Sequence, residues 1–153
     1  MTRKTHLVGA WPGRDPEHAM QTALEKLAPH LDRMTDGETG DRHLWATPAI
    51  DALRTNPDVE IVKDGNWNDY GDVAQFKVRD GATLNPDNLR LPYAGAFAWS
   101  FPAFKVLRER YGRPDLRFQV GLPAPIDMAV FAFGESAFAD QSLVDAFTEA
   151  TGR

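Results

Sequence analysis

Strand-like and helix-like segments alternate along this chain, and the alternation limits the folds that it can adopt. Three short extended segments are each followed by a segment that has apolar residues at helical spacing. The strand-like segments are residues 6–10, 33–35 and 116–122. The helix-like segments after them are residues 16–31, then 41–45 followed by 49–54, and residues 126–133. Repetition of this kind predicts a parallel sheet with crossover helices. We therefore expect an α/β fold with about three parallel β/α repeats.

Two further elements interrupt the repeats. Residues 59–62 and 74–79 alternate weakly between apolar and polar side chains, which predicts an antiparallel β-hairpin inserted at about residues 59–80. Residues 93–111 carry the longest helical pattern, and Pro102 is expected to kink or split this helix near Ser100. Gly112 is a suitable residue to end it.

Capping signals mark the starts of three predicted helices. Asp15-Pro16 and Thr47-Pro48 each combine a capping side chain with a proline at the first helical position. Ser142 is expected to cap the last helix. After Asp15-Pro16, apolar residues recur at helical spacing and predict a buried stripe. They are Met20, Ala23, Leu24, Leu27 and Leu31.

The most polar stretch of the chain is residues 33–43, which hold three carboxylates, two arginines, two glycines and a histidine. Gly37 and Gly40 permit a sharply bent backbone, so Asp36 and Glu38 are expected on a turn and not on a solvated helix face. Such a cluster can form a metal site, an amine-binding carboxylate pair or an acid/base pair. The simpler alternative is a helix–helix turn in which Asp and Gly serve backbone geometry alone.

Three bends are expected to meet in space. They follow the three predicted strands, at residues 9–12, 36–38 and 122–125. Ligands of parallel sheets bind at the carboxyl ends of the strands. We therefore predict one small-molecule site built from all three bends.

Composition narrows the classes of partner and compartment. The 153 residues can bury a real core, and the formal net charge of −5 argues against a nucleic-acid partner. The chain has no cysteine, so it forms neither a disulfide nor a thiolate metal site, which fits a cytoplasmic protein. The apolar run at residues 7–11 is too short for a signal peptide or a membrane span, so no membrane partner is expected.

The three bends, in this order, resemble the catalytic barrel of cobalamin-independent methionine synthase and its bacterial relatives. Thr5-His6-Leu7-Val8-Gly9-Ala10-Trp11-Pro12 is similar to the family's first strand, which ends in Ile-Gly-Ser, an aromatic residue and Pro. Asp36-Gly37-Glu38, with Arg42 shortly after, is similar to its His-Gly-Glu motif. Leu122-Pro123-Ala124-Pro125-Ile126 is similar to its Thr-Gly-Pro-Val-Thr segment.

The resemblance implies a (β/α)₈ barrel that transfers a methyl group from a folate to a zinc-bound homocysteine thiolate. It implies that Glu38 meets the substrate amine, and that backbone groups at Gly9, Ala10 and Trp11 hold the amino-acid carboxylate, with Pro125 nearby. Asp36 is expected to orient Glu38 or to act as acid/base. Arg42 is expected to receive a substrate carboxylate or phosphate, or to form a salt bridge with Asp36 or Asp41.

The chain also departs from the family pattern. Ala10 replaces a serine, and Asp36 replaces a histidine. The zinc ligands of the family come from later strands, which these 153 residues do not include. A full barrel usually needs roughly 250 residues. We therefore expect residues 1–153 to be one incomplete barrel domain that is inactive alone, and that pairs with another copy or with a complementing chain.

Two alternatives stay open. A metal-dependent hydrolase would use Asp36, Glu38, Asp41 and His43 to hold magnesium or manganese, which requires these side chains to converge on one point. A non-catalytic fragment would instead use its uncovered face to form oligomers or to bind a partner.

Overall fold

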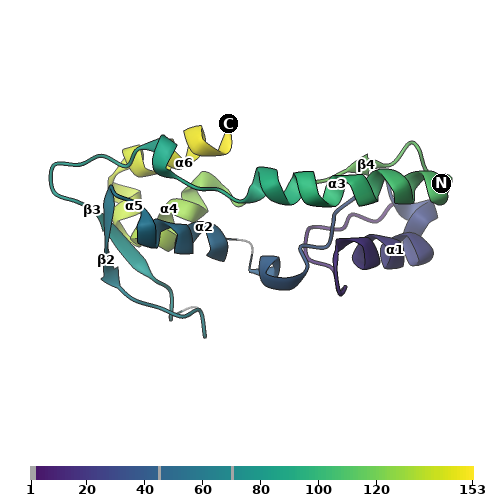
Figure 1. Cartoon of the computed structure of the whole chain (residues 1–153), viewed down its shortest axis with the longest axis horizontal. Helices are drawn as coiled ribbons and strands as arrows, with labels where there is room; N and C mark the ends of the chain where they lie inside the picture. The colour runs from purple at the N-terminus through teal and green to yellow at the C-terminus, as the bar shows by residue number, and fades with distance from the viewer. Residues whose placement is uncertain (1–2, 45, 70) are drawn as a thin grey trace. The chain divides into compact units, whose positions relative to one another are not determined.

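The computed structural model describes residues 3–44, 46–69 and 71–153, with only the backbone of Asp41. Two compact units emerge from the contacts within the chain (Figure 1). The first is formed by Met1–His43 and Tyr93–Leu122, and the second by Leu44–Pro92 and Pro123–Arg153. Each unit is therefore built from two separate stretches of the sequence.

The first unit contains a small parallel sheet. Strand β1 (Arg33–Met34) pairs in parallel with β4 (Arg117–Phe118), with Arg33 opposite Arg117 and Met34 opposite Phe118. On the other side of β1, Thr5 forms a parallel bridge with Leu31. Three segments that are distant in sequence thus run in the same direction, as the alternating pattern predicts.

The strands are shorter than predicted. Residues 6–10 form no strand, and β4 covers only two of the seven residues expected between 116 and 122. The reason is that side chains replace part of the backbone ladder. Gln119 Nε2 donates to the carbonyl oxygens of Leu7 and Val8 at 2.9 and 3.1 Å, and Thr35 Oγ1 donates to that of Gly9 at 2.8 Å.

Helix α1 (Pro16–Leu27) begins where the sequence predicts. The Asp15 carboxylate accepts a hydrogen bond from His18 N at 2.8 Å, and Pro16 occupies the first helical position. The short 3₁₀ helix η1 (Ala28–His30) follows α1. Met20, Ala23 and Leu24 of α1 are buried, which confirms the predicted apolar stripe over these positions.

Helix α3 (Tyr93–Arg110) is continuous across Pro102. Of the two predicted outcomes near Ser100, the split is therefore wrong, and the kink stays a prediction. Phe101 before the proline packs against the core that contains Phe104 after it, so both halves of the helix contact the same core. Gly112 ends the helix as predicted, with φ of +63° and with Arg113 N donating to Arg108 O.

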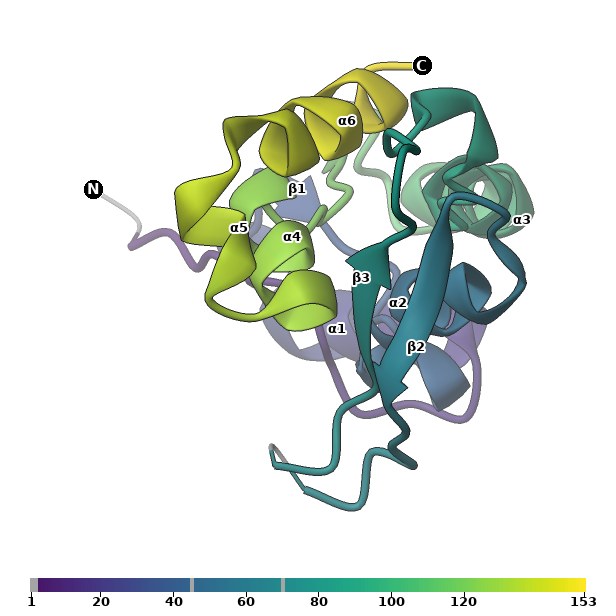
Figure 2. The same cartoon turned by 90° about the vertical axis from the view of Figure 1, so that its left-hand side faces the viewer.

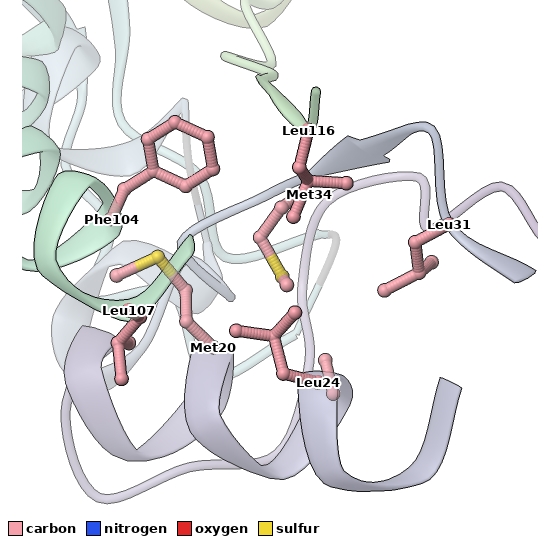
Figure 3. Close-up of a cluster of buried hydrophobic side chains, with 8 residues drawn as sticks. Met20, Leu24, Leu31, Met34, Phe104, Leu107 and Leu116 are labelled. Atoms are coloured by element: carbon pink, nitrogen blue, oxygen red, sulfur yellow. The ribbon is translucent and has the colours of Figure 1, made fainter. Parts of the chain in front are cut away.

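The core of the first unit lies between α1, α3 and the small sheet (Figure 3). Met34 of β1 and Leu116 before β4 approach α1 from the sheet side. The cluster consists of Met20, Ala23, Leu24, Leu31, Met34, Phe104, Leu107 and Leu116. Because all of these are almost fully buried, the core fixes the ends of the segments that carry the polar turn after β1.

The second unit combines a β-hairpin with short helices (Figure 2). Strands β2 (Val59–Lys63) and β3 (Gln75–Val78) pair antiparallel, which confirms the predicted hairpin. Helix α4 (Pro125–Phe133) packs against β3, and α6 (Gln141–Thr151) packs against α4. The smaller helices are η2 (Gly40–His43, in the first unit), α2 (Thr47–Ala52), η3 (Leu53–Thr55), η4 (Pro86–Asn88) and α5 (Ser136–Ala139).

Two predicted caps are displaced. Helix α2 begins at Thr47 itself, after Ala46, and no side chain caps it. The cap of α6 is Asp140, whose carboxylate accepts from Ser142 N at 3.0 Å and from Ser142 Oγ at 2.6 Å. At the start of α6, the carboxylate of Asp140 is a stronger acceptor than the Ser142 hydroxyl and takes the capping role that was expected of Ser142.

The fold is therefore mixed α/β with a small parallel sheet and an antiparallel hairpin. The predicted partial TIM-barrel unit, with three regular β/α repeats, is not shown by the residues that the structure describes. The single domain over residues 1–153 stays a prediction. Within the same described ranges, no helix combines the length and the apolar character that crossing a membrane requires.

Candidate functional site

The polar turn after β1 is strained and tightly packed. Gly37 has φ of +82°, and Glu38 has φ of +45°, which is uncommon for a residue with a side chain. A Cβ atom at Gly37 would lie 2.7 Å from Ala19 Cβ, so only glycine fits this position. Asp36 Oδ1 accepts a hydrogen bond from Glu38 N at 3.1 Å and closes the turn.

The carboxylate of Glu38 lies against two glycines from other parts of the first unit. A Cβ atom built at Gly9 would lie 2.7 Å from both Glu38 Oε1 and Glu38 Oε2. A Cβ atom built at Gly121 would lie 2.7 Å from Glu38 Oε1. The carboxylate thus occupies space that side chains at positions 9 and 121 would otherwise fill.

Hydrogen bonds fix the N-terminal segment to this turn. Trp11 N donates to Gly37 O at 2.9 Å, and Thr35 Oγ1 donates to Gly9 O at 2.8 Å. Gln119, two residues before Gly121, holds Leu7 and Val8 as described above. Three segments are therefore joined around Glu38: the one after the Thr5 bridge, the one after β1 and the one after β4. The sequence predicts this meeting for the bends at residues 9–12 and 36–38.

Asp36 and Arg42 form the ion pair of the site. Arg42 Nη1 donates to Asp36 Oδ2 at 2.8 Å, and the two side chains are only 15% and 11% exposed. The Arg42 guanidinium also lies 5.6 Å from the centre of the Trp99 ring, within range of a cation–π contact. Arg42 therefore forms the salt bridge to Asp36, one of the two roles that the sequence left open.

The surroundings of Glu38 raise its pKa. Burial, followed by the nearby Asp36 carboxylate, raises the pKa of Glu38, whereas Arg42 acts to lower it. A half-buried carboxylate with a raised pKa gains more than an exposed one when a cation comes close. The arrangement is suited to binding an ammonium group or to holding and releasing a proton.

The other predicted site residues lie at different places in the structure, and not all of them belong to the first unit. Ala10 is exposed, and Trp11 is half-buried against the core of the first unit. Pro125 is the first residue of α4 in the second unit, so its participation stays a prediction. Asp41 has no described side chain, and His43 Nδ1 lies 2.9 Å from Gly40 O.

Sequence reasoning missed three residues of this site: Thr35, Gln119 and Gly121. A signal was present for Gly121, because a glycine inside a strand-like run often marks the close approach of another group. No comparable local signal marks Thr35 or Gln119. Their importance comes from carbonyl groups more than 25 and 110 residues away in sequence.

Metal binding receives no support from the described side chains. They contain no group of three or more His, Cys, Asp or Glu residues that could hold a metal ion. Zinc, which the family resemblance implies, therefore does not fit the described residues. The same finding gives no support to the metal-dependent hydrolase.

Comparisons with known proteins assign this chain to no family. A scan of protein-family models, a search of curated proteins and a search of solved structures each find no match to this chain.

Proposed function

We propose that this chain is a methionine synthase-like domain that binds an amino acid, with the ligand ammonium group at Glu38. The observation that carries the proposal is the position of the Glu38 carboxylate against Gly9 and Gly121. An ammonium ion next to this carboxylate would offset the unfavourable effect of burial on its charge. The ordered motifs around Gly9 and Asp36-Gly37-Glu38 support the family assignment.

The ligand carboxylate is assigned to the backbone at Ala10. Trp11 N is occupied by Gly37 O, so this amide is not the anion donor that the resemblance implies. Ala10 is exposed and lies beside Gly9 in the same bend. Arg42 keeps a supporting role, because its bond to Asp36 holds the turn that presents Glu38.

The proposal for this chain is limited to substrate binding. Methyl transfer from a folate to a thiolate is the family's reaction, and the zinc that activates the thiolate there does not fit the described residues. Asp36 positions Glu38 through the bond to Glu38 N. A cytoplasmic location is proposed with the same function and is consistent with the lack of cysteine.

A thermal-shift comparison of three ligands tests the proposal. Methionine carries both charged groups, N-acetylmethionine lacks the ammonium group, and methioninamide lacks the carboxylate. We expect methionine, and homocysteine likewise, to raise the melting temperature, because a ligand that binds only the folded state stabilises it. N-acetylmethionine should have no effect, and methioninamide a reduced one.

Glu38→Gln provides the matched variant, because it keeps the shape of the side chain and removes the charge. This variant should fold and lose the response to methionine. An equal response to N-acetylmethionine, or an unchanged response in Glu38→Gln, would show that Glu38 does not bind the amine.

Self-association is a second candidate, favoured by one face of α3. Trp99 and Val106 are seven residues apart, so they lie on the same side of the helix, and their exposed fractions are 63% and 56%. A second copy of the chain is the proposed occupant. Light scattering after size exclusion should give a dimer mass for the wild type and a lower mass for Val106→Ser. A monomer at every concentration would exclude this candidate.

A further inference from the structure

A hollow lined by residues with charged or polar side chains lies toward the amino ends of the parallel segments of the first unit. Its volume is about 230 Å³. The lining residues are Lys4, Thr5, His6, Asp32, Arg33 and Arg117. Thr5 precedes Gly9 by four residues, which corresponds to about 13 Å along an extended chain. The hollow is therefore separate from the Glu38 site.

Positive charge is in excess in this hollow. Lys4 Nζ lies 2.6 Å from Asp32 Oδ1, so the one carboxylate of the lining is paired with the lysine. Among residues whose side chains are described, no carboxylate lies within 4.0 Å of the guanidinium of Arg33 or Arg117. The adjacent Asp115 is paired with Arg113 at 2.8 Å. Two arginines with no described carboxylate partner thus line the hollow, in a chain whose net charge is −5.

The register of the sheet places these two charges side by side. Arg33 and Arg117 are partners in the β1–β4 pairing, and both are exposed. Neighbouring strands are about 4.8 Å apart, and partners in a sheet share a face. Met34 and Phe118, the next pair, lie on the other face, where Met34 joins the core. Like charges in this relation repel one another.

We propose that the hollow binds a phosphate dianion, either free or as the monoester of a small molecule. Two adjacent guanidinium groups supply the planar donor pairs that bind phosphate oxygens, and together they balance a charge of −2. The anion would also relieve the repulsion between Arg33 and Arg117. The volume suits a compact ligand, and the negative net charge of the chain disfavours a nucleic-acid polymer.

Calorimetric titration with inorganic phosphate tests the site at constant ionic strength, maintained with sodium chloride. We expect saturable binding to the wild type, and at least about tenfold weaker binding to Arg33→Gln and to Arg117→Gln, since each loses charge-assisted hydrogen bonds. Arg110→Gln is the control, because it removes the same charge from an exposed position of α3 outside the hollow. Its affinity should equal that of the wild type.

Three results would overturn the proposal. They are the absence of saturable binding, an equal loss of affinity in Arg110→Gln, and an equal effect of chloride. Titration with ethyl phosphate separates the two sources: tighter binding than inorganic phosphate indicates a monoester, and weaker binding indicates the free ion. Arg117→Lys keeps the charge without the paired donors and should fall between the wild type and Arg117→Gln. Glu38→Gln should bind phosphate normally, which separates this test from that of the proposed amino-acid site.

Discussion

The carboxylate of Glu38 occupies the space where Gly9 would carry a side chain. A Cβ atom at Gly9 would lie 2.7 Å from both carboxylate oxygens, although all of α1, η1 and β1 lie between the two residues in sequence. A glycine that appears to serve a turn thus makes room for a charged group. The same relation holds for Gly121, on the segment that follows β4.

Gly9→Ala and Gly121→Ala are expected to displace the Glu38 carboxylate while leaving the fold intact. The atoms in conflict are at the end of a flexible side chain that can rotate away, so the melting temperature should change little. Methionine affinity should fall at least about tenfold, because a lost charge-assisted contact costs roughly 1.5–3 kcal/mol. Titration of each variant with methionine measures the effect.

Gly95→Ala is the control for this pair. Gly95 lies within α3, and no atom lies within 4 Å of the position of its missing Cβ. Alanine at this position in the first turn of α3 should not destabilise the fold and should leave methionine affinity unchanged. If Gly9→Ala and Gly121→Ala bound methionine as the wild type does, ligand binding would not depend on the position of the Glu38 carboxylate.

The free energy of unfolding of Glu38→Gln, relative to that of the wild type, should increase as pH rises. The pKa of Glu38 is raised in the folded chain by burial and by Asp36. The unfolded chain therefore loses this proton first, and the free energy of unfolding falls as pH rises from about 4.5 through the raised pKa. Glutamine does not titrate, so the stability of Glu38→Gln relative to the wild type should be higher at pH 7 than at pH 4.

Glu60→Gln should behave in the opposite way. A hydrogen bond from Lys77 lowers the pKa of Glu60, so this carboxylate stabilises the fold above about pH 4.5 and loses the effect as pH falls. Urea unfolding of both variants at the two pH values gives the comparison. The same sign for both variants would contradict the assigned environment of Glu38.

Local patterns were sufficient to predict the start of α1, the end of α3 and the hairpin. The Asp15-Pro16 start of α1, the Gly112 end of α3 and the β2–β3 pairing depend on residues close together in sequence. The parallel direction of the three segments also followed from the order of the elements. The error at the start of α6 has a local origin too, since Asp140 and Ser142 compete for the same cap position. At α2 the helix begins one residue earlier than expected, at Thr47.

Strand lengths and the details of the site could not be predicted in this way. Gln119 and Thr35 bond to backbone carbonyl groups of residues 7–9, and these bonds replace a regular ladder. Nothing near either residue in sequence indicates such a partner. The Asp36-Gly37-Glu38 turn itself was recognised, because glycine between two carboxylates is a local signal.

Tyr93 should make the chain sensitive to alkaline pH. Burial raises the pKa of Tyr93 to about 12 from its usual 10. The unfolded chain loses the phenol proton first, so the free energy of unfolding should fall as pH rises from about 10 to 12. Tyr93→Phe should show a shallower fall over this range. The ultraviolet absorbance of the wild type minus that of the variant should show one phenolate forming near pH 12. Formation of this phenolate near pH 10 would contradict the burial of Tyr93.

Asp36→Ala should destabilise the fold more than the loss of an exposed ion pair. Asp36 accepts from Arg42 Nη1 and from Glu38 N, and its side chain is 11% exposed. Removing one partner of a buried pair typically costs about 3 kcal/mol or more. Denaturant unfolding should detect this loss, with little dependence on salt because the pair is shielded from solvent.

Lys77→Ala is the control for Asp36→Ala, because Lys77 pairs with Glu60 at 2.7 Å on an exposed strand surface. Its free energy of unfolding should change little, since exposed ion pairs contribute weakly to stability. If Asp36→Ala were as stable as Lys77→Ala, the Asp36–Arg42 pair would not hold the turn. Glu38 would then keep its position through Gly37 and the hydrogen bonds of Trp11 and Thr35 alone.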